Sequence, residues 1–357
     1  MLDRFDDAVA AVVPPDQLAF DEAAAHHDRL TKPRGSLGRL EPLGCRLAAI
    51  ARMSPPPVPT PAAVAVFAGD HGVLAQGVTP WPAEVTAQMV ANFCAGGAAV
   101  NALASQVGAT VTVIDVGVAS TLPPELDGQL LRRRVRSGTG DIAVESAMTP
   151  DEAQAALDVG AEVAASLVAA GARCLVTGDM GIGNTTPSAA LIAVLCGRVP
   201  ADVTGRGTGI DDATLARKIS AVERAIGRAS AAGDLDDARG ALSSLGGLEI
   251  AALTGFVTGG AAAGVPVVVD GVIALAATVV AHAICPDVVG YVIAGHRSTE
   301  PGASAALDHL GLDPLVDLGL RLGEGTGALL ALPLVQGAAR VLNDMATFDS
   351  AGVTEKE

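Results

Sequence analysis

The chain has 357 residues, half of them apolar, which is enough to bury a large core in one or two domains. Aromatic residues make up only 2%, so the core consists mainly of Ala, Val and Leu, which suits helices packed on buried strands and argues against an all-β sandwich. The net charge of −16 repels phosphate backbones and excludes nucleic acid as the expected partner.

Both ends of the chain show helical patterns without strand-like runs, as in residues 21–29 and 328–348. We expect a small helical domain from residues 1–55 and 330–357, and a large α/β domain from residues 56–329. The Pro-rich segment 54–61 is a stiff connector that marks the boundary.

Six short apolar runs in the large domain are each followed by a turn with Gly or Asp and then by a helix-like segment. The runs are residues 63–67, 110–114, 173–176, 265–269, 288–293 and 315–322. Because they are apolar throughout rather than alternating, they predict parallel strands covered by helices on both faces. Ligands of such sheets bind beyond the carboxyl ends of the strands, so the following turns should converge on one crevice.

Residues 178–187 join one of these strands to a helix expected over residues 188–196. Inner glycines let backbone N–H groups turn towards a ligand, and side-chain donors follow near a helix N-terminus, where an anion is favoured. The donors are Gly181, Gly183, Asn184, Thr185 and Thr186. The segment lacks the Gly-Lys-Ser/Thr of a nucleoside-triphosphate loop. It predicts a phosphate-binding loop, although an ordinary tight turn with a helix N-cap has the same spacing.

Residues 321–327, Arg-Leu-Gly-Glu-Gly-Thr-Gly, place Glu324 between two glycines just after an apolar run. The glycines permit close approach of a ligand, and an aromatic substrate packed on the carboxylate would raise its pKa towards that of a general base. Spacing alone leaves a solvated loop carboxylate as an equal alternative.

Two more strand ends carry polar residues. In the turn that begins at residue 295, Arg297 and Ser298 could bind an anion. His296 in the same turn is suited equally to a capping role and to catalysis. Asp70 and His71 pair an acid with an imidazole, but no further ligand residue stands nearby at suitable spacing, so structural turn chemistry is favoured over a metal site.

Trp81 is the only tryptophan and lies between two prolines before an amphipathic helix. Its ring either stacks on a flat ligand or anchors a loop in the core.

The five cysteines form no CxxC pair and lie in apolar surroundings, which indicates buried thiols in a reducing compartment. The N-terminus lacks the pattern of a secretory signal. The most apolar stretch, residues 267–285, contains Asp270 and His282 and is followed by Pro286, which argues against a membrane span. We therefore expect a cytoplasmic protein.

Eight segments, taken in chain order, together resemble the nicotinate-nucleotide:5,6-dimethylbenzimidazole phosphoribosyltransferases of cobalamin lower-ligand synthesis. They are residues 32–41, 67–73, 85–90, 178–186, 204–209, 269–271, 296–298 and 321–327. The resemblance implies a Rossmann-like parallel sheet flanked by helices, a small helical domain from both chain ends, and a homodimer. It further implies transfer of the phosphoribosyl group of nicotinate mononucleotide to 5,6-dimethylbenzimidazole, giving α-ribazole 5′-phosphate and nicotinate, with no cofactor and no metal.

The resemblance also implies roles for single residues. Glu324 matches the catalytic base, and Asp179 stands where the family commonly has a Glu that supports this base. The residues implied in the nucleotide and phosphate site are Gly181, Gly183, Asn184, Thr185, Thr186, Ser298, Arg321 and Gly323, with Lys218 contributed by the neighbouring subunit. Those implied in the benzimidazole site are Trp81, Gln88 and Met89. A second departure is Ala303, where a His is frequent.

The expected reaction needs only one proton acceptor. The leaving pyridine nitrogen is already cationic, so no general acid is required. Glu324 would take the benzimidazole N–H proton while the other ring nitrogen attacks C1′ of the ribose. Two alternatives stay open: a related transferase that uses adenine or a phenol as acceptor, and a non-catalytic nucleotide sensor, for which Asp179 is the only support in the sequence.

Overall fold

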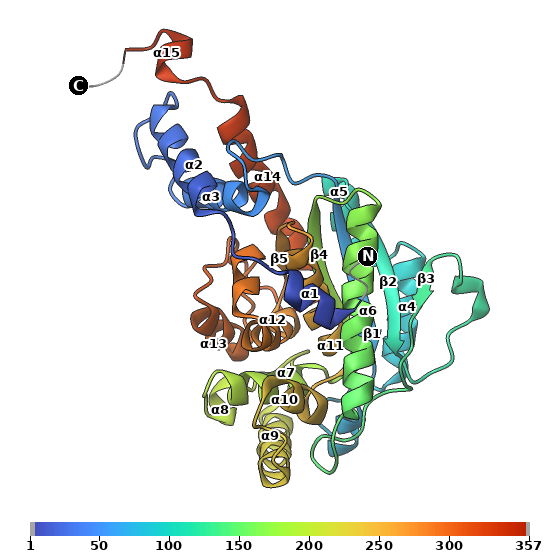
Figure 1. The fold of residues 1–357 in the computed structure, drawn as a ribbon. Coiled ribbons are helices and arrows are strands. Elements are labelled where there is room, and N and C mark those ends of the chain that lie inside the picture. Colours follow the sequence, from blue (N-terminus) through green and yellow to red (C-terminus); the bar gives the residue numbers. More distant parts are fainter. Residues whose placement is uncertain (1–3, 355–357) are drawn as a thin grey trace.

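A computed structural model describes residues 4–354 of the chain (Figure 1). Its centre is a six-stranded sheet in the order β3-β2-β1-β4-β5-β6, in which every neighbouring pair is parallel. The strands are β1 (Ala62–Gly69), β2 (Thr110–Gly117), β3 (Leu130–Arg132), β4 (Cys174–Met180), β5 (Val267–Val269) and β6 (Val292–Ala294). The predicted α/β fold with a Rossmann-like parallel sheet is confirmed.

Helices cover both faces of the sheet (Figure 1). On one face α11 (Leu248–Ala262) and α12 (Val272–Ile284) pack against the strands, and α6 (Pro150–Ala169), α7 (Thr185–Leu195) and α10 (Ala238–Leu245) pack on these helices in the same core. The other packs against α4 (Glu84–Cys94), α5 (Ala99–Val107) and the first half of α14 (Thr326–Asp344). The remaining elements are α1 (Phe5–Ala11), α2 (Gln17–Arg29), α3 (Leu40–Ala51), α8 (Pro200–Val203), α9 (Asp212–Ala232), α13 (Pro301–Leu310), α15 (Phe348–Ala351) and the 3-10 helices η1 (Gly72–Gln76), η2 (Pro124–Leu126) and η3 (Pro286–Tyr291).

The central strand β1 shows why its sequence is apolar without alternation. Ala65 and Phe67 join the core between the sheet and α11, whereas Val64 and Val66 join the core between the sheet and α14. Successive side chains of a strand point to opposite faces, so a strand covered on both sides buries all of them.

Small residues allow α6 and α11 to pack closely. A Cβ atom on Gly160 would overlap the backbone of Ala252, and one on Gly255 would overlap the carbonyl group of Leu157. The two helices therefore touch backbone to backbone. This close packing explains how a core with few aromatic side chains fills its volume.

Helices from the two ends of the chain pack together. Helices α2, α3 and α14 pack together and form a lobe that projects away from the strands, whereas α1 packs against α6 and α11 (Figure 1). The predicted division into two domains, residues 1–55 with 330–357 and residues 56–329, stays a prediction. Helix α1 belongs to the first of these segments but packs on the helices that cover the sheet.

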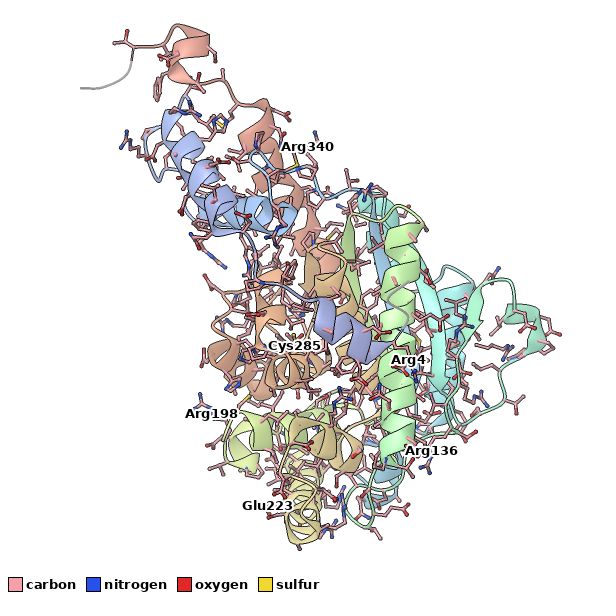
Figure 2. All side chains as sticks on the ribbon, viewed as in Figure 1. Arg4, Arg136, Arg198, Glu223, Cys285 and Arg340 are labelled. Carbon is pink, nitrogen blue, oxygen red and sulfur yellow. The ribbon has the colours of Figure 1, made fainter. Side chains whose placement is uncertain are left out.

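Arg198, Glu223 and Arg340, labelled in Figure 2, lie on outlying helices and loops and are exposed.

Five predicted strands are confirmed, but the sixth, over residues 315–322, is wrong. Val316 forms a single parallel bridge with His296, and the chain then leaves the sheet. Gly319 has a left-handed φ of 68°, and Leu318 is 65% exposed, so the segment is neither straight nor buried on both faces.

The sixth strand of the sheet is β3, at the edge next to β2, and the sequence did not predict it. This edge strand has only three residues, of which Leu130 is buried and the other two are exposed. A strand with a single buried position needs no run of apolar residues, so its sequence carries no pattern that predicts it.

No helix among residues 4–354 is long and apolar enough to cross a membrane. The cysteines at positions 45, 174 and 285 are buried thiols as predicted, but Cys94 and Cys196 are only half-buried, because both lie at the C-terminal ends of helices.

Candidate active site

A cavity of about 410 Å³ opens at the carboxyl ends of β4, β5 and β6. The strand order reverses between β1 and β4, and such a reversal leaves a crevice in which open α/β sheets bind their ligands. Turns after three strands and the start of α14 form its floor, and the segment before and within α4 forms one wall. The convergence expected from the apolar runs therefore occurs.

Most residues expected at the site line this one cavity. They are Trp81, Met89, Asp179, Gly181, Gly183, Asn184, Thr185, Thr186, Lys218, Ser298, Arg321, Gly323 and Glu324. Gln88 is the exception: it is exposed on α4 and does not line the cavity. On this helix Val85 and Met89 face the cavity, and Gln88 lies on a different face.

The phosphate loop ends at the N-terminus of α7. Asn184 occupies the N-cap position, but its side chain does not cap the helix; its Nδ2 donates instead to Asp179 Oδ2 at 3.1 Å. The first turn of α7 therefore has no cap from this side chain. Thr186 Oγ1 is buried with no hydrogen-bond partner among residues 4–354. Unpaired donors at a helix N-terminus favour an anion over the alternative of an ordinary capped turn.

Lys218 reaches this loop from α9. Its Nζ donates to Thr185 Oγ1 at 2.8 Å and to the carbonyl oxygen of Gly205 at 2.9 Å. Burial lowers the pKa of Lys218 to about 8, and the charge of Glu300 opposes that shift. Because α9 packs on α7, Lys218 lines the cavity of its own chain, whereas the resemblance implied a contribution from the neighbouring subunit.

The rim of the cavity carries two arginines, Arg206 and Arg321. Arg321 Nη1 donates to the carbonyl oxygen of Gly207 at 3.0 Å, and the N–H of Gly207 donates to Glu300 Oε1 at 2.7 Å. The loop that carries Gly207 is thus held from two sides. Together with Lys218, these groups make the loop end of the cavity cationic.

Glu324 lines the same cavity. It is 6% exposed, and its Oε2 has no hydrogen-bond partner among the described residues. Burial, and then the charge of Asp270, raises the pKa of Glu324 to about 7, although a backbone N–H of Val100 lowers it. A buried carboxylate with a free oxygen and a pKa near neutrality is suited to accept a proton, which a solvated loop carboxylate is not.

Asp179 lies between Glu324 and the phosphate loop at the end of β4. Burial raises the pKa of the Asp179 carboxyl well above its usual range, and the charges of Asp270, Glu249 and Glu324 add to this, whereas the hydrogen bond from Asn184 opposes it. Asp179 Oδ1 has no partner among residues 4–354. Such surroundings favour the neutral form of the carboxyl group, which can donate a hydrogen bond.

The wall near α4 is apolar. It consists of Val78, Val85, Met89, Met180 and Ile182, with Trp81 at the mouth, where the indole is 49% exposed. An exposed indole at the entrance favours stacking on a ligand over the alternative of a core anchor. Such a wall fits a flat aromatic ring.

Asp70 and His71 bind other groups of the protein, which agrees with the structural role favoured from the sequence. Asp70 Oδ2 accepts a hydrogen bond from the N–H of Ala119 at 2.8 Å, and His71 pairs with Glu249 at 2.7 Å. Among residues 4–354, no group of three or more His, Cys, Asp or Glu side chains is arranged to hold a metal ion.

Sequence reasoning missed three residues that shape the site: Glu249, Asp270 and Glu300. Asp270 had a signal, since it follows an apolar run and precedes a glycine like the other strand-end residues. Glu249 and Glu300 had none, because their partners are distant in the chain.

The chain is similar to known proteins in sequence and in structure. A family model described as phosphoribosyltransferase matches residues 12–353. The chain is 59% identical over 368 residues to a nicotinate-nucleotide–dimethylbenzimidazole phosphoribosyltransferase of Salinispora tropica, with 100% of both chains covered. It is 48% identical to a protein of the same name from Chloroflexus aurantiacus, with 99% of this chain and 100% of the relative covered. The crystal structure of CobT from Thermus thermophilus superposes with a TM-score of 0.90 at 46% identity, over 95% of this chain and 100% of that one.

Proposed function

Because the chain belongs to the nicotinate-nucleotide–dimethylbenzimidazole phosphoribosyltransferase family, we propose that it moves the phosphoribosyl group of nicotinate mononucleotide to 5,6-dimethylbenzimidazole, giving α-ribazole 5′-phosphate and nicotinate. The reaction belongs to cobalamin synthesis. The observation that carries the proposal is the placement of a buried proton acceptor, Glu324, in the same cavity as a cationic phosphate loop and an apolar wall.

The donor fits the cationic end of the cavity. Its phosphate would accept hydrogen bonds from Lys218, Thr185 and Thr186 and from backbone N–H groups at the start of α7. Ser298 and Arg321 line the same end and are proposed to contact the nucleotide. This placement directs the ribose towards Asp179 and Glu324.

The acceptor fits the apolar wall. In the transfer, one benzimidazole nitrogen forms the bond to C1′ while the bond from C1′ to the pyridine nitrogen breaks, and its electron pair neutralises the cationic ring. The proton on the other benzimidazole nitrogen passes to Glu324. Attack opposite the leaving group inverts the anomeric carbon and produces the α-ribosyl product.

Glu324→Gln is the test of this mechanism. Nicotinate release, followed by chromatography, should fall by more than about 100-fold, while equilibrium binding of nicotinate mononucleotide persists. In the unaltered protein the rate should rise with pH through about 7, because only the ionised carboxylate accepts a proton. Near-normal turnover of Glu324→Gln would overturn the role of Glu324.

Loss of folding would not explain the loss of rate. Burial disfavours the ionised Glu324, so above the usual pKa of Glu this side chain destabilises the fold. Glu324→Gln should therefore melt at the same temperature or higher at pH 8.

The same assay separates the alternatives. A panel of benzimidazoles, purines and phenols identifies the acceptor, since the choice of ring would depend on the apolar wall of Val85, Met89 and Met180, whereas the proton acceptor Glu324 is the same for each. Absence of nicotinate release with every acceptor would favour a nucleotide sensor. We also propose that the protein is a cytoplasmic homodimer, and sedimentation of the purified protein would test the dimer.

A further inference from the structure

Asp270 follows β5 and is completely buried beside the start of α14. Its Oδ1 accepts hydrogen bonds from the N–H groups of Gly327 at 2.7 Å and Ala328 at 3.0 Å, and its Oδ2 accepts one from the N–H of Gly325 at 3.1 Å. Its own N–H donates to Thr177 Oγ1 on β4 at 3.0 Å. A carboxylate at the end of β5 thus accepts hydrogen bonds from three backbone N–H groups that lie more than 50 residues further along the chain.

The turn that it holds is unfavourable by itself. Gly323, Glu324 and Gly325 have φ values of 84°, 65° and 93°, all in the left-handed region. A non-glycine residue is strained there and persists only where its surroundings impose this conformation. Gly325 is the N-cap of α14 and has no side chain to cap that helix. Asp270 supplies the missing cap, and its charge lies at the favourable end of the helix dipole.

We propose that Asp270 is the positioning residue of this site, which fixes the left-handed turn so that Glu324 faces the acceptor ring. The proposal rests on the proposed role of Glu324 as the base. Asp270 itself does not line the cavity, so it acts through the turn and not on the substrate.

Asp270 also has an electrostatic effect on Glu324, since its charge is the second cause, after burial, that raises the pKa of Glu324. The other ionisable groups facing this cluster are His296, whose Nε2 lies 3.5 Å from Asp270 Oδ1, Asp179 on β4 and Glu249 at the start of α11. Burial raises the pKa of Asp270, while His296 and the three backbone N–H groups lower it. Removal of this charge should therefore make Glu324 more acidic.

Asp270→Asn tests the proposal because it keeps the shape of the side chain but loses the charge and one acceptor oxygen. We expect kcat to fall by about 10- to 100-fold, since displacement of a catalytic group by about 1 Å has this effect. The KM for nicotinate mononucleotide should change by less than about threefold, and the rising limb of the pH–rate profile should move to lower pH.

Asp115→Asn is the matched control. Asp115 is a buried aspartate at the carboxyl end of β2, where it accepts a hydrogen bond from the N–H of Val118 at 2.9 Å and pairs with Arg134 at 3.0 Å, outside the cavity. This variant should lose stability without a change in kcat or in the pH profile. An equal fall of kcat in both variants, or unchanged kcat and pH profile in Asp270→Asn, would overturn the proposal.

A milder pair of variants keeps the test valid if Asp270→Asn does not fold. Thr177→Val removes the hydroxyl that accepts from the Asp270 N–H, whereas Thr177→Ser keeps it. Thr177→Val should lower kcat by about 3- to 10-fold at unchanged KM, and Thr177→Ser should not. Equal kcat values in the two variants would overturn the proposal.

The outcome for Glu324→Gln separates this inference from the proposed function. If Glu324→Gln turns over normally, the base assignment fails irrespective of Asp270. If Glu324→Gln is inactive but Asp270→Asn matches the unaltered protein in kcat and pH profile, only the positioning role fails.

Discussion

His71 and Glu249 form a buried ion pair, with 2.7 Å between the imidazole Nε2 and a carboxylate oxygen, directly beneath the phosphate loop. A Cβ atom on Gly181 would lie 3.1 Å from the same imidazole nitrogen. Burial lowers the pKa of His71, but the charge and hydrogen bond of Glu249 outweigh it, so the pKa lies above its usual value. The pair therefore supports the loop from below, and Glu249 favours the protonated form of the imidazole.

Glu249→Gln should destabilise the fold in a pH-dependent manner. Because the pKa of His71 is raised in the folded protein, the stability from this pair is complete below the usual His pKa and is lost as pH rises through the raised value. The free energy of unfolding should thus fall most near pH 6, by about 3 kcal/mol as for a broken buried pair, and the fall should become smaller as pH rises through the raised pKa of His71.

The control for this variant is Glu162→Gln, which breaks an exposed pair with Arg133 and should change the free energy of unfolding little at any pH in this range. A pH-independent effect of Glu249→Gln would contradict an ionised His71.

Asp179→Asn should retain turnover within about tenfold, in contrast to Glu324→Gln. The surroundings of Asp179 raise the pKa of its carboxyl group well above the usual range and so favour the neutral acid, which an amide of the same shape replaces with small loss. The measurement is the rate of nicotinate release at pH 7.5. A loss as large as that of Glu324→Gln would mean that Asp179 acts as an ionised base.

Lys218→Met should raise the KM for nicotinate mononucleotide by about 10- to 100-fold and change kcat less. This rise in KM corresponds to the loss of one hydrogen bond to a charged group. In the unaltered protein, kcat/KM for the donor should fall as pH rises above about 8, because the lysine then loses its charge. Steady-state kinetics between pH 6 and 9.5 test both points. Arg224→Met, which changes an exposed residue of the same helix, should leave KM unaltered.

Gly160→Ala should destabilise the protein by about 3 kcal/mol or more, because its Cβ atom would overlap the backbone of α11. Gly227→Ala on α9 is the control: its Cβ atom meets nothing within 4 Å, and alanine is the better helix former, so stability should rise by about 1 kcal/mol. Denaturant unfolding measures both. Similar midpoints for the two variants would contradict the close packing of α6 and α11.

The sequence by itself determined the features whose causes are local. Apolar runs without alternation located five of the six strands, since a strand buried on both faces needs no polar positions. Glycine spacing and strand ends located the phosphate loop and Glu324, because the carboxyl ends of parallel strands meet at one edge of the sheet.

Only the tertiary structure decided the features that depend on distant partners. Residues 315–322 are apolar enough for a strand but leave the sheet after one bridge, and the edge strand β3 forms from a segment with a single buried side chain. The ion pair of His71 and Glu249 joins residues 178 positions apart. The pKa of Glu324 likewise depends on burial and on Asp270, which follows β5 and is distant in the chain. Desolvation and charge depend on distance in space, which local sequence patterns do not contain.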